Sequence, residues 1–235
     1  MSLYLRQLLA GRDFARTDSV ASQMANFVYV IGDDQTRQCV IVDPAWDVKG
    51  ILDYLDKEDM RLSGALVTHY HPDHIGGEIF GLSISGLAEL LALRPVQVHV
   101  NQAEAEGVRS VTGISASDIV LHDAGDEVQV GDITIRLLHT PGHTPGSQCF
   151  LVGSTLVSGD TLFINGCGRV DLPGGNPEQM YVSLTQVLGR LPGDTILYPG
   201  HHYAPALQST IAEEKRHNVF MRITDRTSWL GLMNQ

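Results

Sequence analysis

The sequence contains no apolar run of the roughly 20 residues that a membrane-spanning helix needs. Residues 1–19 also lack a long apolar segment and a cleavage site of small residues, so no secretory signal is expected. Cysteine is scarce as well, with three residues, an odd number, and no CxxC pair. A disulfide framework is therefore not expected, and a reducing cytoplasmic location is predicted.

Positive charge is the minority sign. Sixteen Lys and Arg face 27 Asp and Glu, which gives a net charge of −11, and no run of basic residues occurs. This balance argues against nucleic acid or an anionic membrane as the main partner. A small molecule is the expected partner, and association into a homodimer stays open.

What the sequence does contain is an alternation of two kinds of pattern. Runs rich in Val, Ile and Thr predict strands at 25–31, 38–43, 64–68, 96–100, 133–139, 147–152, 154–159 and 194–200. Helical patterns occupy 48–60, 176–191 and 207–223, the second beginning with an Asn cap and a first-turn proline. The alternation predicts an α/β fold in which helices enclose sheets, and a four-layer α/β/β/α arrangement is compatible with it. We expect one domain over 1–235 with a short helical tail from about 207.

The segment 78–96 is longer than a minimal connection and unusually apolar. Its ordinary interpretation is a core helix within "GLAELLAL" (86–93). A wall or lid over a site, or a dimer contact, is the alternative. Core packing with some contribution to the shape of a pocket is favoured.

The stretch "THYHPDHIGG" (68–77) places three histidines and an aspartate within six consecutive positions. It follows a predicted strand directly, and three later strands also end in a tight turn followed by His or Asp. Ligands in open α/β sheets gather beyond the carboxyl ends of strands. If these four strand ends are adjacent, seven side chains converge: His69, His71, Asp73, His74, His143, Asp160 and His201.

The local geometry of this stretch suggests two metal positions. Residues two apart in an extended segment point to one side, so His69 and His71 can bind the same ion. Pro72 then turns the chain, and Asp73 and His74 face another direction. A carboxylate such as Asp160 can bridge two ions about 3.5–4 Å apart. Nitrogen and oxygen ligands suit zinc or iron.

The motifs "THYHPDH", "HTPGHTPGS", "SGDTLF" and "YPGHHY" resemble those of the metallo-β-lactamase superfamily, over about residues 20–220. The resemblance implies that superfamily's α/β/β/α sandwich. It also implies a first metal on His69, His71 and His143, and a second on Asp73, His74 and His201, with Asp160 bridging. No cysteine stands at a ligand position, which argues against penicillin hydrolysis.

"GDTLFINGCGR" (159–169) is similar to both glyoxalase II and persulfide dioxygenase, which act on glutathione thiol derivatives. Glyoxalase II implies two divalent ions, zinc being favoured, and a metal-bound hydroxide that attacks a thioester or ester. Asp73 and Asp160 are then the catalytic carboxylates, acting as metal ligands. Persulfide dioxygenase implies one iron on His69, His143 and Asp160. The retained ligand set favours the hydrolase, with the dioxygenase as the alternative.

Two further side chains are candidates for substrate binding. Arg169 could clamp a substrate carboxylate, or form a surface salt bridge instead. Tyr203 follows His201 closely and could orient an oxyanion or a thiol group. A non-catalytic or nuclease member of the superfamily is the third class. The intact ligand set and the acidic balance argue against it.

Overall fold

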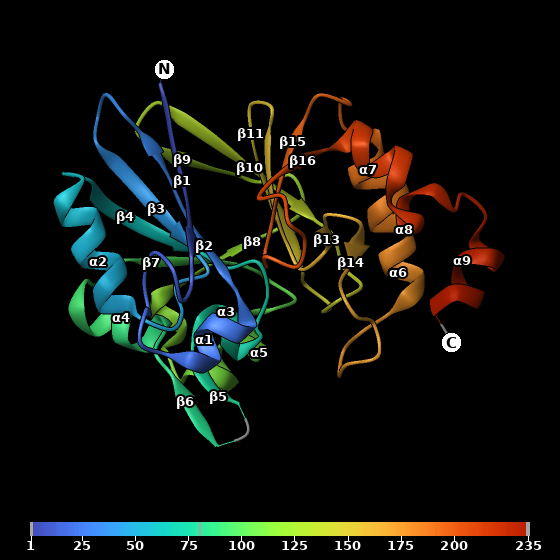
Figure 1. Cartoon of the computed structure of the whole chain (residues 1–235). Helices are drawn as coiled ribbons and strands as arrows, with labels where there is room; N and C mark the ends of the chain where they lie inside the picture. Colours follow the sequence, from blue (N-terminus) through green and yellow to red (C-terminus); the bar gives the residue numbers. More distant parts are fainter. Residues whose placement is uncertain (1, 80, 234–235) are drawn as a thin grey trace.

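The structure is a computed structural model that describes residues 2–79 and 81–233. Two six-stranded sheets pack face to face, and helices cover the outer face of each (Figure 1). This arrangement confirms the predicted α/β class and its order of layers.

Each sheet is built from one half of the chain. The first sheet runs in the order β1 (Leu3–Leu9), β2 (Phe27–Asp33), β3 (Gln38–Val42), β4 (Arg61–Leu66), β7 (Gln97–Asn101) and β8 (Ile119–His122). The second runs in the order β16 (Ser209–Thr210), β15 (Ile196–Pro199), β12 (Thr155–Gly159), β11 (Gln148–Val152), β10 (Ile133–His139) and β9 (Glu127–Val130). Two short pairs complete the strands: β5 (Gly77–Ile79) with β6 (Leu82–Ile84), and β13 (Leu162–Phe163) with β14 (Gly166–Cys167). The chain passes from the first sheet to the second through residues 123–126.

The helices also divide between the two halves. Those of the first half are α1 (Ser19–Met24), α2 (Val48–Lys57), α3 (Pro72–Ile75), α4 (Leu87–Leu93), α5 (Ala105–Thr112) and the 3₁₀ turn η1 (Ala116–Asp118). Those of the second are α6 (Pro177–Val182), the π-helical η2 (Ser183–Val187), the 3₁₀ turn η3 (Leu188–Arg190), α7 (Ile211–His217), α8 (Val219–Arg222) and α9 (Arg226–Met233). None of the helices in the described residues has the length and apolar character needed to cross a membrane.

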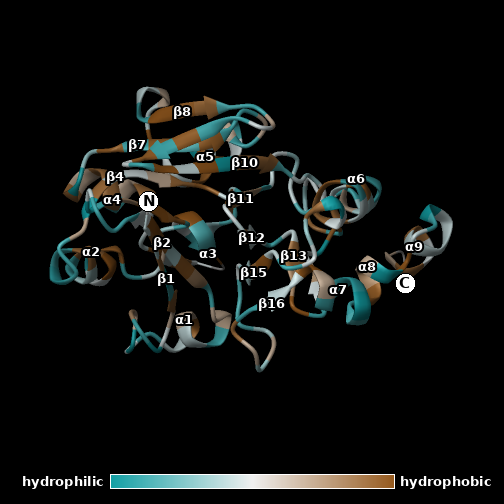
Figure 2. Ribbon diagram, turned by 90° about the horizontal axis from the view of Figure 1, so that it is seen from above, coloured by the Kyte–Doolittle hydropathy of each residue, from teal (hydrophilic) through white to brown (hydrophobic). Residues whose placement is uncertain are grey.

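Strand alternation explains how one sheet serves two cores. In β3, Val40 and Val42 enter the cluster between the two sheets, whereas Cys39 and Ile41 pack against the helices of the first half. Residues two apart on a strand point to the same face, so such a strand must be apolar throughout. Many residues of the inner strands are accordingly coloured as hydrophobic in Figure 2.

Two of the helix predictions need correction. The pattern 176–191 begins as expected, with Asn176 accepting a hydrogen bond from Gln179 N and Pro177 in the first turn, but it continues as η2 and η3. The pattern 207–223 forms helix only from residue 211 and breaks at Asn218. This residue has extended backbone angles, and its side chain accepts from Phe220 N and donates to Gly166 O. Periodicity alone predicts one continuous helix, but the capping Asn218 ends α7 and begins α8.

The segment 78–96 forms β6 and α4, and Leu87 and Leu90 pack into the core of the first half. None of its described residues lines the large cavity beside the histidines, so the expected contribution to pocket shape is wrong. The strands β1, β8 and β9 were not predicted from the sequence. All three are edge strands, where exposed positions weaken the apolar pattern.

Candidate metal centre

The predicted ligands lie at strand ends that share one edge of the sandwich. β12 and β15 are parallel neighbours, so Asp160 and His201 follow adjacent carboxyl ends. β10 runs in the same direction as β12, because each is antiparallel to β11 between them. The end of β4 is joined to this edge across the sandwich, since Gln148 N donates to Thr68 O over 3.0 Å and Gln148 Nε2 to Val67 O over 2.8 Å.

The stretch after β4 turns as expected at Pro72. His71 has extended backbone angles and stands just before α3, which begins at Pro72 and carries Asp73 and His74. His69 and His71 therefore leave the strand before the turn, and the other two side chains leave the helix after it. The turn is what divides one short motif between two groups of ligands.

Three histidines form the first group, composed of His69, His71 and His143. His71 Nδ1 lies 3.0 Å from His69 Nε2 and 3.0 Å from His143 Nε2. His69 and His143 are buried, and His71 is half-buried, so the group is open on the side of His71.

Asp73, His74 and His201 form the second group, in which all three residues are buried. The Nε2 atoms of His74 and His201 are 3.1 Å apart, and Asp73 Oδ2 lies 3.4 Å from each of them. The two groups lie side by side, because the ring centroids of His69 and His74 are 4.2 Å apart.

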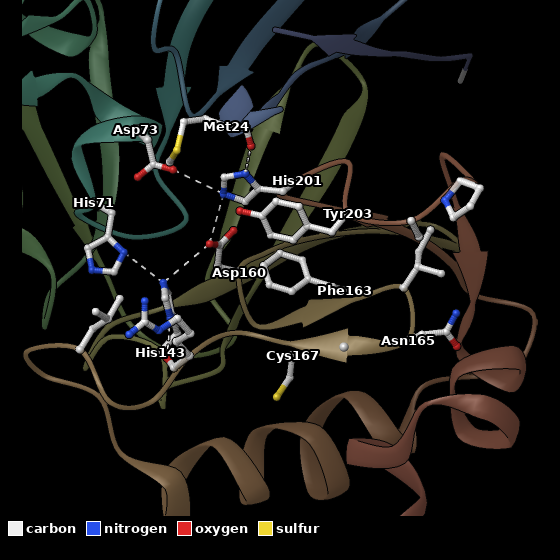
Figure 3. A pocket seen from close by; sticks show the side chains of 16 residues that line it. Met24, His71, Asp73, His143, Asp160, Phe163, Asn165, Cys167, His201 and Tyr203 are labelled. Carbon is white, nitrogen blue, oxygen red and sulfur yellow. Dashed lines mark hydrogen bonds and ion pairs between the residues drawn. The ribbon is translucent and has the colours of Figure 1, made fainter. Parts of the chain in front are cut away.

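Asp160 stands between the two groups. Its Oδ2 lies 3.7 Å from His143 Nε2 and 3.4 Å from His201 Nε2, and its Oδ1 lies 3.4 Å from His74 Nε2. Among the described residues Oδ1 finds no hydrogen-bond partner although it is buried. A Cβ at Gly200 would overlap this oxygen, so the turn before His201 needs glycine. Figure 3 shows Asp160 pointing toward His143 and His201.

The outer ring nitrogens fix the direction of the lone pairs. His143 Nδ1 donates to Arg169 O over 2.7 Å and His201 Nδ1 to Met24 O over 2.8 Å, since a carbonyl oxygen only accepts. His74 Nδ1 likewise bonds Asp43 Oδ2 at 2.9 Å. In the neutral rings the Nε2 atoms of all three are therefore acceptors that face into the cluster. Such outer hydrogen bonds are typical of histidines that bind metal.

This donor set fits metal ions. Two acceptor nitrogens 3.1 Å apart, as in His74 and His201, repel each other unless a cation lies between them. Ligands around a tetrahedral zinc with bonds of 2.0–2.1 Å are separated by about 3.3 Å, close to the separations within both groups. The unpartnered oxygen of Asp160 adds a further free acceptor at the shared edge. Ligation by the seven residues stays a prediction that this geometry is able to satisfy.

The two groups differ in the pKa values of their histidines. Burial, followed by the neighbouring histidines, lowers the pKa of His71 to about 4 and that of His69 well below its usual value. In the second group burial acts in the same direction, but the carboxylates of Asp160 and Asp73 outweigh it. They raise the pKa of His201 to about 9 and that of His74 well above its usual value. The histidines of the second group thus favour the protonated form, whereas His69 and His71 of the first group favour the neutral form.

Two supporting acids were missed in the sequence. Asp43 follows β3, accepts from Thr68 N over 2.8 Å and also bonds His74. "VIVDP" has the same strand-then-acid pattern as the other strand ends and could have indicated it. Glu104 is fully buried and accepts from Tyr70 N at 2.9 Å and Gly146 N at 2.6 Å, which ties the loop of His69 and His71 to the loop of His143. No sequence signal indicated Glu104.

A cavity of about 660 Å³ opens beside the cluster, and five of the seven predicted ligands line it. Met24, Phe163 and Leu172 give it apolar walls. Cys167 also lines it, with its sulfur directed away from the histidines in Figure 3. The space is therefore bounded by polar ligands on one side and by apolar groups on the other.

The two candidate substrate residues both line this cavity. Tyr203 is 60% exposed, and its ring stacks on that of His201 at 4.7 Å between centroids. Arg169 donates to both carboxylate oxygens of Asp171, over 2.9 and 2.7 Å. The structure therefore contains the salt bridge that was the alternative for Arg169, at a position that still borders the cavity.

Comparison with known proteins gives a consistent result. The sequence pattern of the Metallo-beta-lactamase superfamily matches residues 22–201. The chain is 35% identical to human mitochondrial persulfide dioxygenase ETHE1, over 82% of this chain and 70% of that protein. It is 33% identical to a probable hydroxyacylglutathione hydrolase of Schizosaccharomyces pombe, over 85% of this chain and 84% of that protein. The crystal structure of ETHE1 from Myxococcus xanthus superposes with a TM-score of 0.79 at 34% identity, covering 99% of this chain and 90% of that one.

Proposed function

The chain belongs to the metallo-beta-lactamase superfamily, and from that premise we propose that it is a metal-dependent hydrolase of a thioester or ester. An acyl-glutathione is the substrate class to test first, because a similar protein is a probable hydroxyacylglutathione hydrolase. The observation that carries the proposal is a complete second group, Asp73, His74 and His201, lying beside the first. Two full sets of metal-binding atoms favour a reaction that uses two ions over one that uses a single ion.

The proposed site holds two divalent ions, zinc by preference, the first on His69, His71 and His143 and the second on Asp73, His74 and His201. When bound, such ions polarise a carbonyl oxygen and lower the pKa of a coordinated water to about 7. Asp160 keeps its charge in the cluster, since His201 and His74 lower its pKa although burial opposes them. Its two oxygens are directed at both groups, so this one carboxylate sets the spacing between them.

The cavity supplies the remaining requirements. The apolar side chains of Met24, Phe163 and Leu172 can hold an acyl chain and keep bulk water from it. Tyr203 places a hydroxyl near His201, where it can donate to an oxygen of the substrate. Arg169 at the border of the cavity can bind a carboxylate of the thiol carrier, in exchange for Asp171.

A second candidate is a persulfide dioxygenase with one iron on His69, His143 and Asp160. It is favoured by the 35% identity to the human persulfide dioxygenase. In that reaction His71, Asp73, His74 and His201 surround the ligands without binding metal. The two candidates therefore differ in metal number as well as in reaction.

Metal content and two assays decide between them. The protein as purified, and after loading with zinc or with ferrous iron, is analysed for bound metal and assayed with an acyl-glutathione for release of free thiol. The same samples are assayed with glutathione persulfide for oxygen uptake. Two zinc ions with thiol release support the hydrolase, and one iron with oxygen uptake overturns it in favour of the dioxygenase. Fully loaded protein that performs neither reaction contradicts both.

A pair of variants provides the control. His201→Ala removes a proposed ligand, whereas His217→Ala removes a histidine that is 60% exposed on α7. Thiol release is expected to fall only in His201→Ala. An equal loss in both variants would show that the assay follows protein quality and not the site.

A further inference from the structure

Beyond the seven predicted ligands, a chain of two hydrogen bonds leads from the protein core to the second group. The indole Nε1 of Trp46 donates to Asn26 Oδ1 over 3.0 Å, and Asn26 Nδ2 donates to Asp73 Oδ2, also over 3.0 Å. Asn26 is 2% exposed and Trp46 is 8% exposed. Both bonds are therefore shielded from water, where the loss of one is costly.

The direction of this chain is fixed by chemistry. An indole N–H only donates, so Trp46 requires the oxygen of the Asn26 amide and turns the NH₂ toward Asp73. The amide nitrogen also lies 3.4 Å from Nε2 of His74 and 3.4 Å from Nε2 of His201. It thus lies within 3.4 Å of the predicted metal-binding atoms of all three members of the second group.

Asn26 is in the same position toward Asp73 as the outer partners are toward the histidines. His143 and His201 are oriented by carbonyl oxygens, and His74 by Asp43. Outside the predicted ligands, Asn26 is the one hydrogen-bond donor to Asp73 among the residues that the structure describes. Outside the predicted ligands, it is therefore this hydrogen bond that sets which oxygen of Asp73 faces the rings of His74 and His201.

The backbone of Trp46 carries a second, independent sign of constraint. Its φ is +74°, and that of Asp43 is +54°, in a region that non-glycine residues seldom occupy and that a bulky residue adopts only under constraint. Trp46 N also donates to Ser85 O over 2.9 Å, which anchors the turn. Strained residues that the surrounding structure holds in place are often found at functional sites. Here Asp43 bonds His74 directly, and Trp46 is linked to Asp73 through Asn26.

We propose that Trp46 and Asn26 are positioning residues for the second metal-binding group, which set the orientation of Asp73 and thereby the affinity for the second ion. The inference rests on the two-metal form of the proposed function. Neither residue lines the cavity, so their effect on a substrate is indirect.

The test measures zinc affinity step by step, by competition with a chromophoric chelator, in the wild type, Trp46→Phe and Asn26→Leu. Partners of metal ligands typically contribute 10–100-fold in affinity. The second zinc is therefore expected to bind about 10-fold more weakly in Trp46→Phe and up to about 100-fold more weakly in Asn26→Leu. The first zinc should bind as in the wild type.

Trp229→Phe is the matched control. Trp229 is fully buried and its indole donates to Phe220 O over 3.1 Å in α8, so this variant loses the same kind of bond away from the site. Both zinc affinities should stay at the wild-type values in this control. Thermal unfolding of each variant without metal shows whether it is folded, and Trp46→Phe keeps the test decisive if Asn26→Leu does not fold.

The outcomes separate this inference from the proposed function. A second zinc that binds normally in folded Trp46→Phe and Asn26→Leu overturns the positioning role and leaves the hydrolase proposal standing. A parallel loss of both affinities also overturns it, because it indicates general packing. A wild type that binds only one zinc at saturation contradicts the two-metal proposal itself, and the positioning role with it.

Discussion

The two groups of predicted ligands differ in chemistry although their rings are in contact. The first consists of three histidines, of which His69 and His71 have lowered pKa values, and the second contains a carboxylate and two histidines whose pKa values are raised. Burial lowers the pKa of His69, His71, His74 and His201 alike, so burial does not cause the difference. It arises from Asp73 and Asp160, each of which has an oxygen 3.4 Å from Nε2 of His74 and one 3.4 Å from Nε2 of His201.

This contrast predicts that protons would compete with a cation more strongly at the second position than at the first. A ligand must be deprotonated before it binds metal. His69 and His71 of the first group have already lost their extra protons at neutral pH, whereas His74 and His201 of the second group must release theirs. The positions are therefore expected to fill in order as pH rises, and the following experiments test that asymmetry.

The largest effect is expected from removing one histidine of each group. Either His143→Ala or His201→Ala should lower the proposed hydrolysis by more than about 100-fold, above the range typical of residues that only support ligands. The measurement is kcat/KM with an acyl-glutathione at saturating zinc. If His201→Ala keeps full activity while His143→Ala is inactive, the reaction needs the first group alone.

A change of pH should separate the groups next. His201 has a pKa of about 9, so below pH 9 its proton competes with the second ion, and affinity falls by about 10-fold per pH unit for each proton displaced. His71, with a pKa of about 4, and His69, whose pKa is also lowered, carry no proton at pH 6, so the first ion should lose less affinity than the second between pH 8 and pH 6. Stepwise zinc titration at the two pH values measures this. Equal losses at both positions would contradict the assignment of charge.

Much of this arrangement could be predicted from the sequence, because the ligands follow strand ends and strand ends share an edge. The division at Pro72 needed only the local rule that extended residues alternate. Asn26 and Trp46 could not be predicted, since each acts through a partner far along the chain. Local rules also failed at Asn218, where tertiary hydrogen bonds to Gly166 and the cap of α8 interrupt a regular helical pattern.

Glu104 tests whether the first group is supported from outside in the way that Asp43 supports the second. In Glu104→Gln the amide NH₂ must face either Tyr70 N or Gly146 N, because both oxygens accept from backbone N–H groups. An unsatisfied buried group costs about 1–3 kcal/mol, so the free energy of unfolding should fall by that amount. Denaturant titration of the metal-free protein measures it. An unchanged midpoint would show that the two loops are held by other contacts.

The smallest effect is expected at the border of the cavity. Arg169→Ala should leave folding and both metal affinities unchanged, since its guanidinium is exposed and, among residues 2–79 and 81–233, is bonded only to Asp171. If Arg169 binds a carboxylate of the substrate, KM should rise several-fold with kcat unchanged, as for the loss of an interaction made equally before and during the reaction. Substrates without a carboxylate provide the control, and an equal rise in KM for them would exclude that role.

The passage of the chain through residues 123–126, after one sheet is complete and before the other begins, has a consequence for biosynthesis. A growing polypeptide contains the ligands of the stretch 69–74 early. The first group is completed only by His143 and the second only by His201, both of which are translated later. A prematurely terminated product would therefore carry donors without a finished centre. The proposed activity would appear only once the final strands have docked, so measuring it during synthesis would indicate when folding is complete.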